Sequence, residues 1–205
     1  MLFFGYLCED IYGMISIVET SIPGVLIVEP KVFGDSRGYF LESWSQRDFD
    51  ALVGHIRFVQ DNESKSSYGV VRGLHYQKGM YSQSKLVRVV SGTVLDVAVD
   101  IRRGSPWFGQ HVACILSGEN HRQFFVPRGF AHGFAVLSPD AVFQYKCDNP
   151  YAPDQEGAIA WDDPSLGIDW GIPASSVLLS DKDRHHPLLS EATDLFDYSV
   201  DYYAK

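Results

Sequence analysis

The stretch that decides the fold runs from Arg72 to Ile101. It reads RGLHYQ (72–77), a loop of small and polar residues (78–84), KLVRVV (85–90), the Ser91-Gly92 turn and TVLDVAVDI (93–101). The last two runs alternate in polarity and are rich in β-branched residues, and a glycine separates them, which predicts a β-hairpin. We therefore expect His75, Arg72 and Lys85 on strands, whose side chains alternate between the two faces of a sheet.

The strand predicted over 93–101 has two different faces. One face carries only aliphatic side chains (Leu95, Val97, Val99 and Ile101), and the other carries two carboxylates among small apolar residues (Val94, Asp96, Ala98 and Asp100). This contrast is typical of the wall of a β-barrel or β-sandwich. If the polar face lines a cavity, the nearby His, Lys and Arg provide an acid–base and oxyanion-binding set. A solvated outer face is the alternative, and this stretch leaves both open.

Length and composition describe an ordinary globular protein. The 205 residues suffice for one well-buried all-β domain, and 45% hydrophobic with 21% charged residues is a usual balance. The 18 glycines and 10 prolines indicate many turns and therefore many short strands. Because there is no repeat, linker or low-complexity run, we expect a single domain over residues 14–205, ending in a polar C-terminal tail.

The charge and the cysteines argue against several classes of function. A net charge of −9 argues against nucleic acid as a partner, because binding its phosphates needs a basic surface. An anionic small molecule is compatible with this charge where a few Arg and Lys side chains converge. Cys8, Cys114 and Cys147 are odd in number and form no CxxC pair. They predict neither a disulfide framework nor a zinc site, and they favour a cytoplasmic location.

Residues 1–13 are predicted to be an extension outside the fold. Residues 1–7 are apolar, but no basic region precedes them and they lead directly into Glu9-Asp10, which argues against a signal peptide. Met14 opens the first strand-like segment. No apolar run reaches the length of a membrane-spanning helix, so we expect no membrane partner.

Strand-like segments separated by turns make up most of the chain after residue 14. A tight turn at 34–38 feeds a strand that carries Glu42, and apolar residues at helical spacing predict a helix over 45–52. In the block FFVPRGFAHGFAVL (124–137), a proline and two glycines surround His132, which indicates tightly folded backbone beside a pocket. The remaining predicted strands lie at 15–20, 25–30, 58–66, 109–116 and 141–147.

The histidines favour proton transfer over metal or nucleophilic chemistry. His75 and His132 each stand alone, and the only adjacent pair, His185-His186, lies in the polar tail, whereas metal sites in β-barrels usually combine several histidines with a carboxylate. No Ser or Cys lies in a strained glycine turn of the kind that presents a nucleophile. Proton abstraction from carbon needs a histidine base, a carboxylate to orient it, an acid on the opposite face and cations for the enolate. All of these residue types are present.

Seven blocks together resemble the dTDP-4-dehydrorhamnose 3,5-epimerase family. They occur in the family's order, extend from Ile15 to about Asp183, and lie at 33–42, 60–62, 72–77, 85–88, 126–137, 143–146 and 180–183. The resemblance implies an all-β, cupin-like jelly roll with a few short peripheral helices, without a metal or other cofactor, and a cytoplasmic homodimer. It implies an isomerase that inverts C3 and C5 of dTDP-4-dehydro-6-deoxy-glucose and so feeds dTDP-rhamnose and polysaccharide synthesis.

The same resemblance implies roles for individual residues. His75 would be the general base, Tyr145 the opposing acid, Asp183 the partner that orients His75, and Lys85 the cation beside the enolate oxygen. Tyr151 would stack on thymine, and the first strands would reach the site of the partner subunit. The implied substrate-binding positions are Arg37, Glu42, Gln60, Asp61, Asn62, Arg72, His132, Tyr151, Glu156 and Lys182.

Two departures from the family pattern and two rival functions accompany this interpretation. The loop 78–84 lacks the proline and alanine usual before the lysine, and Pro150 stands where a second aromatic residue is frequent. A relative that inverts only C3 would share the catalytic residues, so the sequence does not separate it from a double epimerase. A non-catalytic cupin that binds sugar nucleotides would lack at least one of His75, Lys85 and Tyr145, and none is missing.

Overall fold

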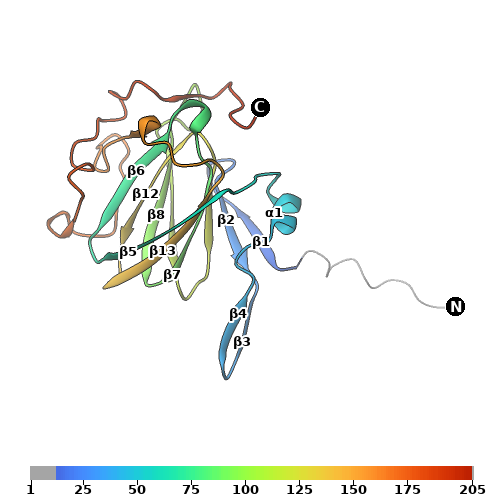
Figure 1. Ribbon diagram of the computed structural model, residues 1–205. Helices are drawn as coiled ribbons and strands as arrows, with labels where there is room; N and C mark the ends of the chain where they lie inside the picture. The colour runs from blue at the N-terminus through green and yellow to red at the C-terminus, as the bar shows by residue number, and fades with distance from the viewer. Residues whose placement is uncertain (1–12, 205) are drawn as a thin grey trace.

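A computed structural model describes residues 13–204 and shows two β-sheets packed face to face (Figure 1). The first sheet has the order β1 (Ile15–Glu19), β2 (Leu26–Pro30), β11 (Gln123–Val126), β7 (Lys85–Ser91), β13 (Asp140–Cys147) and β5 (Gln60–Ser67). The second has the order β10 (His111–Ser117), β8 (Thr93–Asp100), β12 (Phe130–Val136), β6 (Val71–Gln77) and β14 (Glu156–Ala158). Neighbouring strands of both sheets are antiparallel. The predicted all-β, cupin-like jelly roll is confirmed.

Short elements complete the described structure. A hairpin of β3 (Val32–Asp35) and β4 (Gly38–Leu41) follows β2, and a parallel pair joins β9 (Arg102–Arg103) to β15 (Phe196–Asp197). The helices are α1 (Gln46–Leu52) and the 3-10 turns η1 (Gly79–Tyr81), η2 (Pro153–Gln155) and η3 (Ala174–Ser176). The helix expected over 45–52 is therefore confirmed, and Ser45 is its N-cap, accepting a hydrogen bond from the Asp48 N–H. Within residues 13–204, no helix has the length and apolar character that crossing a bilayer requires.

The hairpin predicted for 85–101 is wrong, although both of its strands exist. β7 pairs with β11 and β13 in the first sheet, whereas β8 pairs with β10 and β12 in the second. Gly92, at φ +81°, lies where the chain crosses between the sheets, and a Cβ there would come within 2.1 Å of the Asp140 carbonyl oxygen. A β-branched alternating pattern specifies strands but not which strand pairs with which.

The core between the sheets explains why both layers are rich in apolar residues. Phe134 of β12 stacks on Phe143 of β13 with ring centroids 4.2 Å apart, so an aromatic pair joins the two sheets. Around it lie Val87, Val94, Ala98 and Phe124, each 0% exposed. The face of β8 that carries Asp96 is therefore the interior face, which decides between the two alternatives left open by the sequence.

The C-terminal segment covers the outer face of the second sheet. Its apolar residues Ile159, Trp170, Leu189 and Phe196 pack against that sheet and are buried. The segment after residue 183, predicted as a polar tail, therefore contributes to the core, because its few apolar side chains lie at the positions that face the sheet. Figure 1 shows this segment, in red, wrapped around the upper part of the sandwich.

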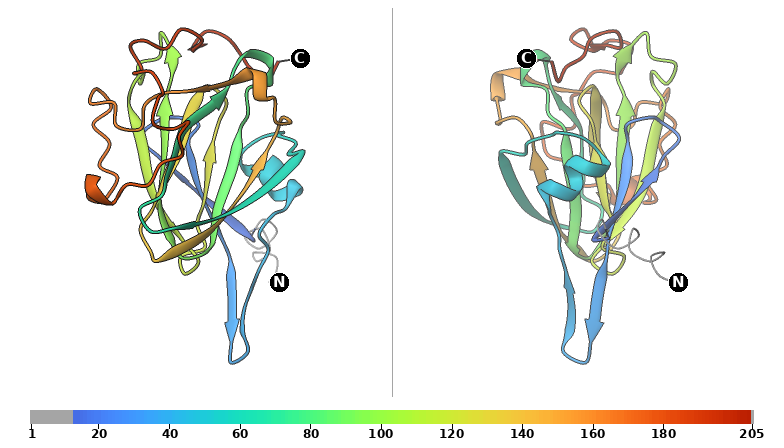
Figure 2. Two further views of the ribbon diagram at one scale, coloured as in Figure 1. Left: turned by 60° about the vertical axis from the view of Figure 1, so that its left-hand side comes forward. Right: turned by 90° about the vertical axis from the view of Figure 1, so that its right-hand side faces the viewer.

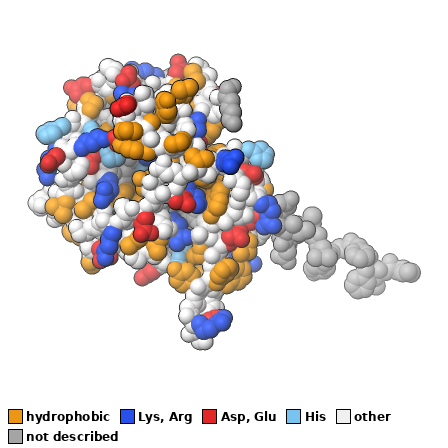
Figure 3. Space-filling model, viewed as in Figure 1, with side chains coloured by type: hydrophobic (Ala, Val, Ile, Leu, Met, Phe, Trp, Pro, Cys, Tyr) orange, Lys and Arg blue, Asp and Glu red, His pale blue; other side chains and the backbone are white. Residues whose placement is uncertain are grey.

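The β3–β4 hairpin, here called the arm, projects from the body of the molecule (Figure 2). Its two strands pair only with each other among the described residues. Phe33, Tyr39 and Phe40 on the arm are 45%, 57% and 65% exposed. Apolar side chains gather near the base of the arm in Figure 3, and the Lys/Arg colour marks its tip. Large aromatic residues exposed together mark a surface that contacts another molecule.

Candidate active site

The centre of the site is a hydrogen bond between His75 and Asp183. His75 lies on β6, and its Nε2 atom is 2.6 Å from Asp183 Oδ1. Asp183 is buried, and its Oδ2 atom accepts a hydrogen bond of 2.8 Å from Ser180 Oγ. Burial pushes the pKa of Asp183 upward, but hydrogen bonds from His75 and Ser180 outweigh it and lower the pKa to about 2. The carboxylate is therefore ionised at neutral pH.

An ionised Asp183 fixes the tautomer of His75. The carboxylate only accepts hydrogen bonds, so His75 Nε2 carries the hydrogen and Nδ1 keeps its lone pair. The imidazole borders an open cavity and is 29% exposed. A histidine held in this way by a carboxylate has the geometry of a general base.

The cavity beside His75 lies between the two sheets and has a volume of about 300 Å³. Strands of both layers contribute to its wall, because β5, β7 and β13 belong to the first sheet and β6 and β14 to the second. Gln60 donates a hydrogen bond of 3.0 Å to Asn62 Oδ1 along this wall. The lining residues are Gln60, Asn62, His75, Tyr76, Gln77, Gln83, Lys85, Tyr145, Cys147, Tyr151 and Glu156. Most of these side chains are polar and can donate or accept hydrogen bonds, which suits a polar ligand.

Lys85 and Tyr145 lie on the wall opposite His75. They belong to the paired strands β7 and β13, and Lys85 Nζ is 6.0 Å from the centre of the Tyr145 ring. Burial lowers the pKa of Lys85, while the nearby Cys147, Asp96 and Glu156 oppose this shift. Burial raises the pKa of Tyr145. The phenol is therefore neutral at neutral pH and can donate its proton, and the Lys85 amine lies next to it.

The rim of the cavity carries an exposed aromatic ring and an ion pair. Tyr151 is 56% exposed, its N–H donates to Gln60 Oε1 over 2.9 Å, and its hydroxyl donates to Glu156 Oε2 over 3.3 Å. Lys182 forms an ion pair with Glu156. Burial would raise the pKa of Glu156, but the hydrogen bond from Lys182 lowers it, so this carboxylate is ionised. The rim offers a flat apolar surface bordered by charges.

His132 lies behind the cavity wall and not on it. It is buried on β12, beside His75 in the register of β6 and β12, and its Nε2 atom is 2.8 Å from Asp96 Oδ1. The other oxygen of Asp96 is buried without a hydrogen-bond partner. Burial raises the pKa of Asp96, and His132 and Lys85 oppose the shift. The sequence placed Asp96 and Asp100 on the same polar strand face and gave neither a role. Asp100 instead accepts hydrogen bonds from Arg102 and Ser105.

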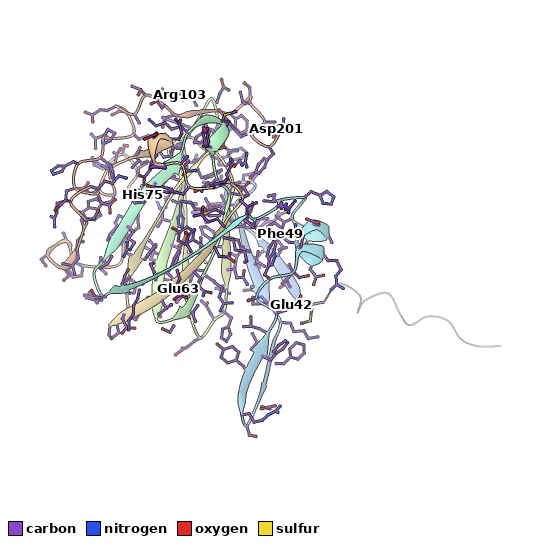
Figure 4. All side chains as sticks on the ribbon, in the orientation of Figure 1. Glu42, Phe49, Glu63, His75, Arg103 and Asp201 are labelled. Carbon is purple, nitrogen blue, oxygen red and sulfur yellow. The ribbon has the colours of Figure 1, made fainter. Side chains whose placement is uncertain are left out.

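Four further predicted residues are not part of the lining of this cavity. Asp61 is on the outer side of the first sheet and pairs with Lys146 over 2.9 Å. Arg72 is exposed and donates to Ser66 Oγ over 3.1 and 3.2 Å. Arg37 lies near the tip of the arm and pairs with its neighbour Asp35. Glu42 follows the arm, and Figure 4 shows it on the opposite side of the molecule from His75.

Sequence reasoning missed His186, which the structure brings to the site. Its Nε2 atom is 3.2 Å from the same Asp183 Oδ1 that binds His75, and its ring meets the His75 ring edge-on with centroids 5.7 Å apart. The available signal was its spacing of three residues from Asp183. A polar tail gives no reason to expect a packed histidine, so the spacing alone does not predict the contact.

Comparisons with known proteins identify the family of this chain. The family model described as dTDP-4-dehydrorhamnose 3,5-epimerase matches residues 19–191. The enzyme of that name from Salmonella typhimurium is 54% identical over 181 residues, covering 87% of this chain and 98% of that enzyme. The enzyme of the same name from Shigella flexneri is 57% identical over 169 residues, covering 82% of this chain and 92% of that enzyme. A Legionella pneumophila 3,5-epimerase, crystallised with dTDP-4-keto-L-rhamnose, is 51% identical with a TM-score of 0.88, covering 91% of this chain and 100% of that one.

Proposed function

The chain belongs to the dTDP-4-dehydrorhamnose 3,5-epimerase family, and we propose that its His75, Lys85 and Tyr145 carry out the family's reaction. The enzyme is an isomerase that inverts C3 and C5 of dTDP-4-dehydro-6-deoxy-glucose to give dTDP-4-dehydro-rhamnose. The observation that carries the proposed roles is the position of a carboxylate-bound histidine on one wall of a cavity and a neutral phenol on the other.

Proton abstraction is the first step at each carbon. The Nδ1 lone pair of His75 takes the hydrogen next to the C4 ketone, and the electrons of the broken C–H bond move onto the ketone oxygen to form an enolate. A positioned base contributes about 10²- to 10⁴-fold to such a step. The Lys85 ammonium faces the developing oxyanion, and one such preorganised donor contributes about 3 kcal/mol.

Reprotonation from the opposite face completes each inversion. The Tyr145 hydroxyl gives its proton to the enolate carbon, the C4 ketone re-forms, and His75 and Tyr145 return to their starting states by proton exchange with solvent. Inversion needs two groups on opposite faces of the sugar, whereas retention needs only one. The two sheets supply these groups separately, which supports the assignment of base and acid.

Positioning of the base is assigned to Asp183, and nucleotide binding to the rim. The 56% exposed ring of Tyr151 provides a stacking surface for thymine. Gln60 and Asn62 provide hydrogen bonds, and Glu156 with Lys182 borders the rim. Arg72 is placed to contact the diphosphate, because it is exposed, donates to the neutral Ser66 hydroxyl and pairs with no carboxylate among residues 13–204. Guanidinium–phosphate contacts act at short range, so they work in a protein of net charge −9.

A homodimer is proposed because, among the described residues, the two strands of the arm pair only with each other and leave aromatic side chains exposed. Arg37 and Glu42 are assigned to substrate binding, yet Arg37 lies in the turn between β3 and β4, Glu42 directly follows β4, and neither lines the cavity of the same chain. Figure 4 shows Glu42 far from His75. The exposed Phe33, Tyr39 and Phe40 supply an apolar surface that a second copy would cover. In the proposed dimer, each arm brings Arg37 and Glu42 to the site of the partner subunit.

The location and domain structure follow the same proposal. The enzyme is assigned to the cytoplasm, and the buried free thiols of Cys114 and Cys147 suit a reducing compartment. Residues 14–205 are assigned to one domain. The predicted extension 1–13 lies almost wholly outside the described residues.

Product analysis tests the function. The purified enzyme is given dTDP-4-dehydro-6-deoxy-glucose in deuterated buffer, together with a ketoreductase that traps the product, and NMR follows both carbons. Deuterium at C3 and C5 of a rhamnose product is expected. Exchange at C3 alone would instead identify a single-centre epimerase. His75→Ala is expected to abolish exchange but to keep dTDP affinity, and undiminished exchange in this variant would remove His75 from the role of base.

A further inference from the structure

Two imidazoles and a carboxylate meet behind the cavity wall. His75 Nε2 and His186 Nε2 lie 2.6 and 3.2 Å from the same Asp183 oxygen. The three ligand atoms all lie within 4.8 Å of one another. The side chains of His186 and Asp183 are 11% and 6% exposed, so the cluster is enclosed and built from two separate segments of the chain.

The separations of these atoms are close to those of a metal site. Zinc binds imidazole nitrogen and carboxylate oxygen at about 2.0–2.2 Å, which puts neighbouring tetrahedral ligands about 3.3–3.6 Å apart. Widening the shorter contact by less than about 1 Å would admit the ion. Two His with one carboxylate and an open fourth position is a ligand set that proteins use for Zn²⁺.

A second pocket beside the substrate cavity gives an ion access to the cluster from the side of His186, and the two pockets share Tyr76 and Glu156 in their linings. This pocket has a volume of about 380 Å³ and is lined by His186, whereas His75 lines the substrate cavity. The pocket contains two lysines, and each forms an ion pair: Lys78 with Asp194 and Lys182 with Glu156. Their positive charges are therefore balanced and do not repel a cation. Glu191 adds a further carboxylate to the lining.

We propose that His75, Asp183 and His186 form an inhibitory site for Zn²⁺ and chemically similar divalent ions. Catalysis needs hydrogen on His75 Nε2 and a lone pair on Nδ1. A metal ion takes the Nε2 lone pair and leaves the hydrogen on Nδ1, so a metal-bound His75 cannot abstract a proton. The site is distinct from metal-assisted catalysis, because the bound ion occupies the base. The inhibitory effect rests on the proposed role of His75, whereas the binding does not.

Titration with Co²⁺ tests the binding. The tag-free enzyme is titrated, and the visible d–d absorption reports the coordination of the ion. We expect one site per chain, weakened by at least about tenfold in His186→Ala, because loss of even an outer partner of a metal ligand costs about 10- to 100-fold. His186→Asn, whose amide can still donate to Asp183, should lose binding as well, while the exposed His185→Ala should keep it.

Two results would overturn the binding site. Equal Co²⁺ affinity in wild-type and both His186 variants would exclude His186 as a ligand. A near-ultraviolet thiolate-to-cobalt band that disappears in Cys147→Ser would assign the ion to the cavity thiol instead.

Inhibition is measured separately, as Zn²⁺-dependent loss of deuterium exchange relative to each variant's own rate without metal. We expect loss of exchange in wild-type and His185→Ala, little loss in His186→Asn, and unchanged dTDP affinity. Exchange that continues at full rate with the His186-dependent site filled would overturn the inhibitory claim and count against His75 as the base. An inactive His75→Ala combined with absent metal binding would overturn only the metal site.

Discussion

His75 and Asp183 are 108 residues apart in the chain and 2.6 Å apart in space. The strand that carries the histidine lies in the second sheet, and the carboxylate reaches it from the segment that covers that sheet's outer face. Because the carboxylate determines which imidazole nitrogen is basic, two distant parts of the sequence together form the proposed general base.

Replacing Asp183 by Asn should lower the exchange rate by about 10²- to 10⁴-fold. The amide can donate to Nε2 and so stabilise the tautomer with hydrogen on Nδ1, which is not basic. Single-turnover deuterium exchange measures the effect. Ser180→Ala, which removes only the 2.8 Å hydrogen bond to Asp183 Oδ2, should cost much less. Comparable losses in the two variants would contradict the tautomer argument.

Asp183 should also make the fold sensitive to acid. Its pKa falls from 3.8 in a model compound to about 2 in the folded protein, so its ionised form contributes stability that is present above about pH 4 and is lost as the pH falls toward about 2. Denaturation midpoints measured across this range should fall more steeply for the wild-type enzyme than for Asp183→Asn. If the midpoints of the two proteins fall in parallel with pH, the Asp183 carboxyl group does not contribute to the pH dependence of stability.

Tyr145→Phe should separate exchange from inversion. His75 can still remove the hydrogen and return deuterium to the same face, so deuterated starting material should accumulate while epimer formation falls by about 10²-fold or more. NMR of the sugar ring distinguishes the two products. Tyr151→Phe, which removes a hydroxyl at the rim, is the matched control and should keep inversion. If Tyr145→Phe still inverts at the wild-type rate, another group is the acid.

Lys85 should set the alkaline limit of activity. Burial lowers its pKa below the usual range of lysine, while burial raises the pKa of Tyr145. The ammonium is therefore lost at a lower pH than an ordinary lysine would lose it, and the enolate then loses its cation. Lys85→Arg, with a side chain that stays charged, should move the alkaline limb of kcat to higher pH even though kcat itself falls. Lys65→Arg on the exposed surface should leave the limb in place.

Mixing two inactive variants tests the shared site. In a heterodimer of His75→Ala and Arg37→Ala subunits, one site combines an intact His75 with an intact Arg37 from the partner's arm, and the other site has neither. Random exchange of subunits should therefore restore about a quarter of wild-type activity for a closed two-fold dimer. Each variant alone should remain low. Absence of recovery after verified exchange would mean that the arm serves its own chain or no site.

Sequence patterns predicted the strands better than their pairing. Alternation identified β7 and β8, and helical spacing identified α1 behind Ser45. The assignment of β7 and β8 to different sheets depends on Gly92, which turns the chain between layers, and alternation carries no information about that choice. The apolar residues that bury the C-terminal segment are too widely spaced to form a recognisable period.

The site residues that lie in family motifs could be predicted from the sequence, and those outside the motifs could not. His75, Lys85 and Tyr145 were identified with their proposed roles, and the structure brings all three to one cavity. The contact of His186 with Asp183 is local, at a spacing of three residues, but the contact of both with His75 joins two distant segments and is invisible in the order of residues. Asp96 and Asp100 looked equivalent in sequence, yet one binds His132 inside the sandwich and the other binds Arg102.

The long separation between β6 and the segment that covers it has a consequence during synthesis. When β6 has been synthesised, His75 is present but Asp183 is not. The apolar face of the second sheet also lacks the C-terminal segment that covers it. Since chains emerge from the N-terminus onward, the enzyme gains its proton-abstracting group only as the final segment leaves the exit tunnel. Incomplete translation products are therefore expected to be inactive and to expose apolar surface that chaperones bind.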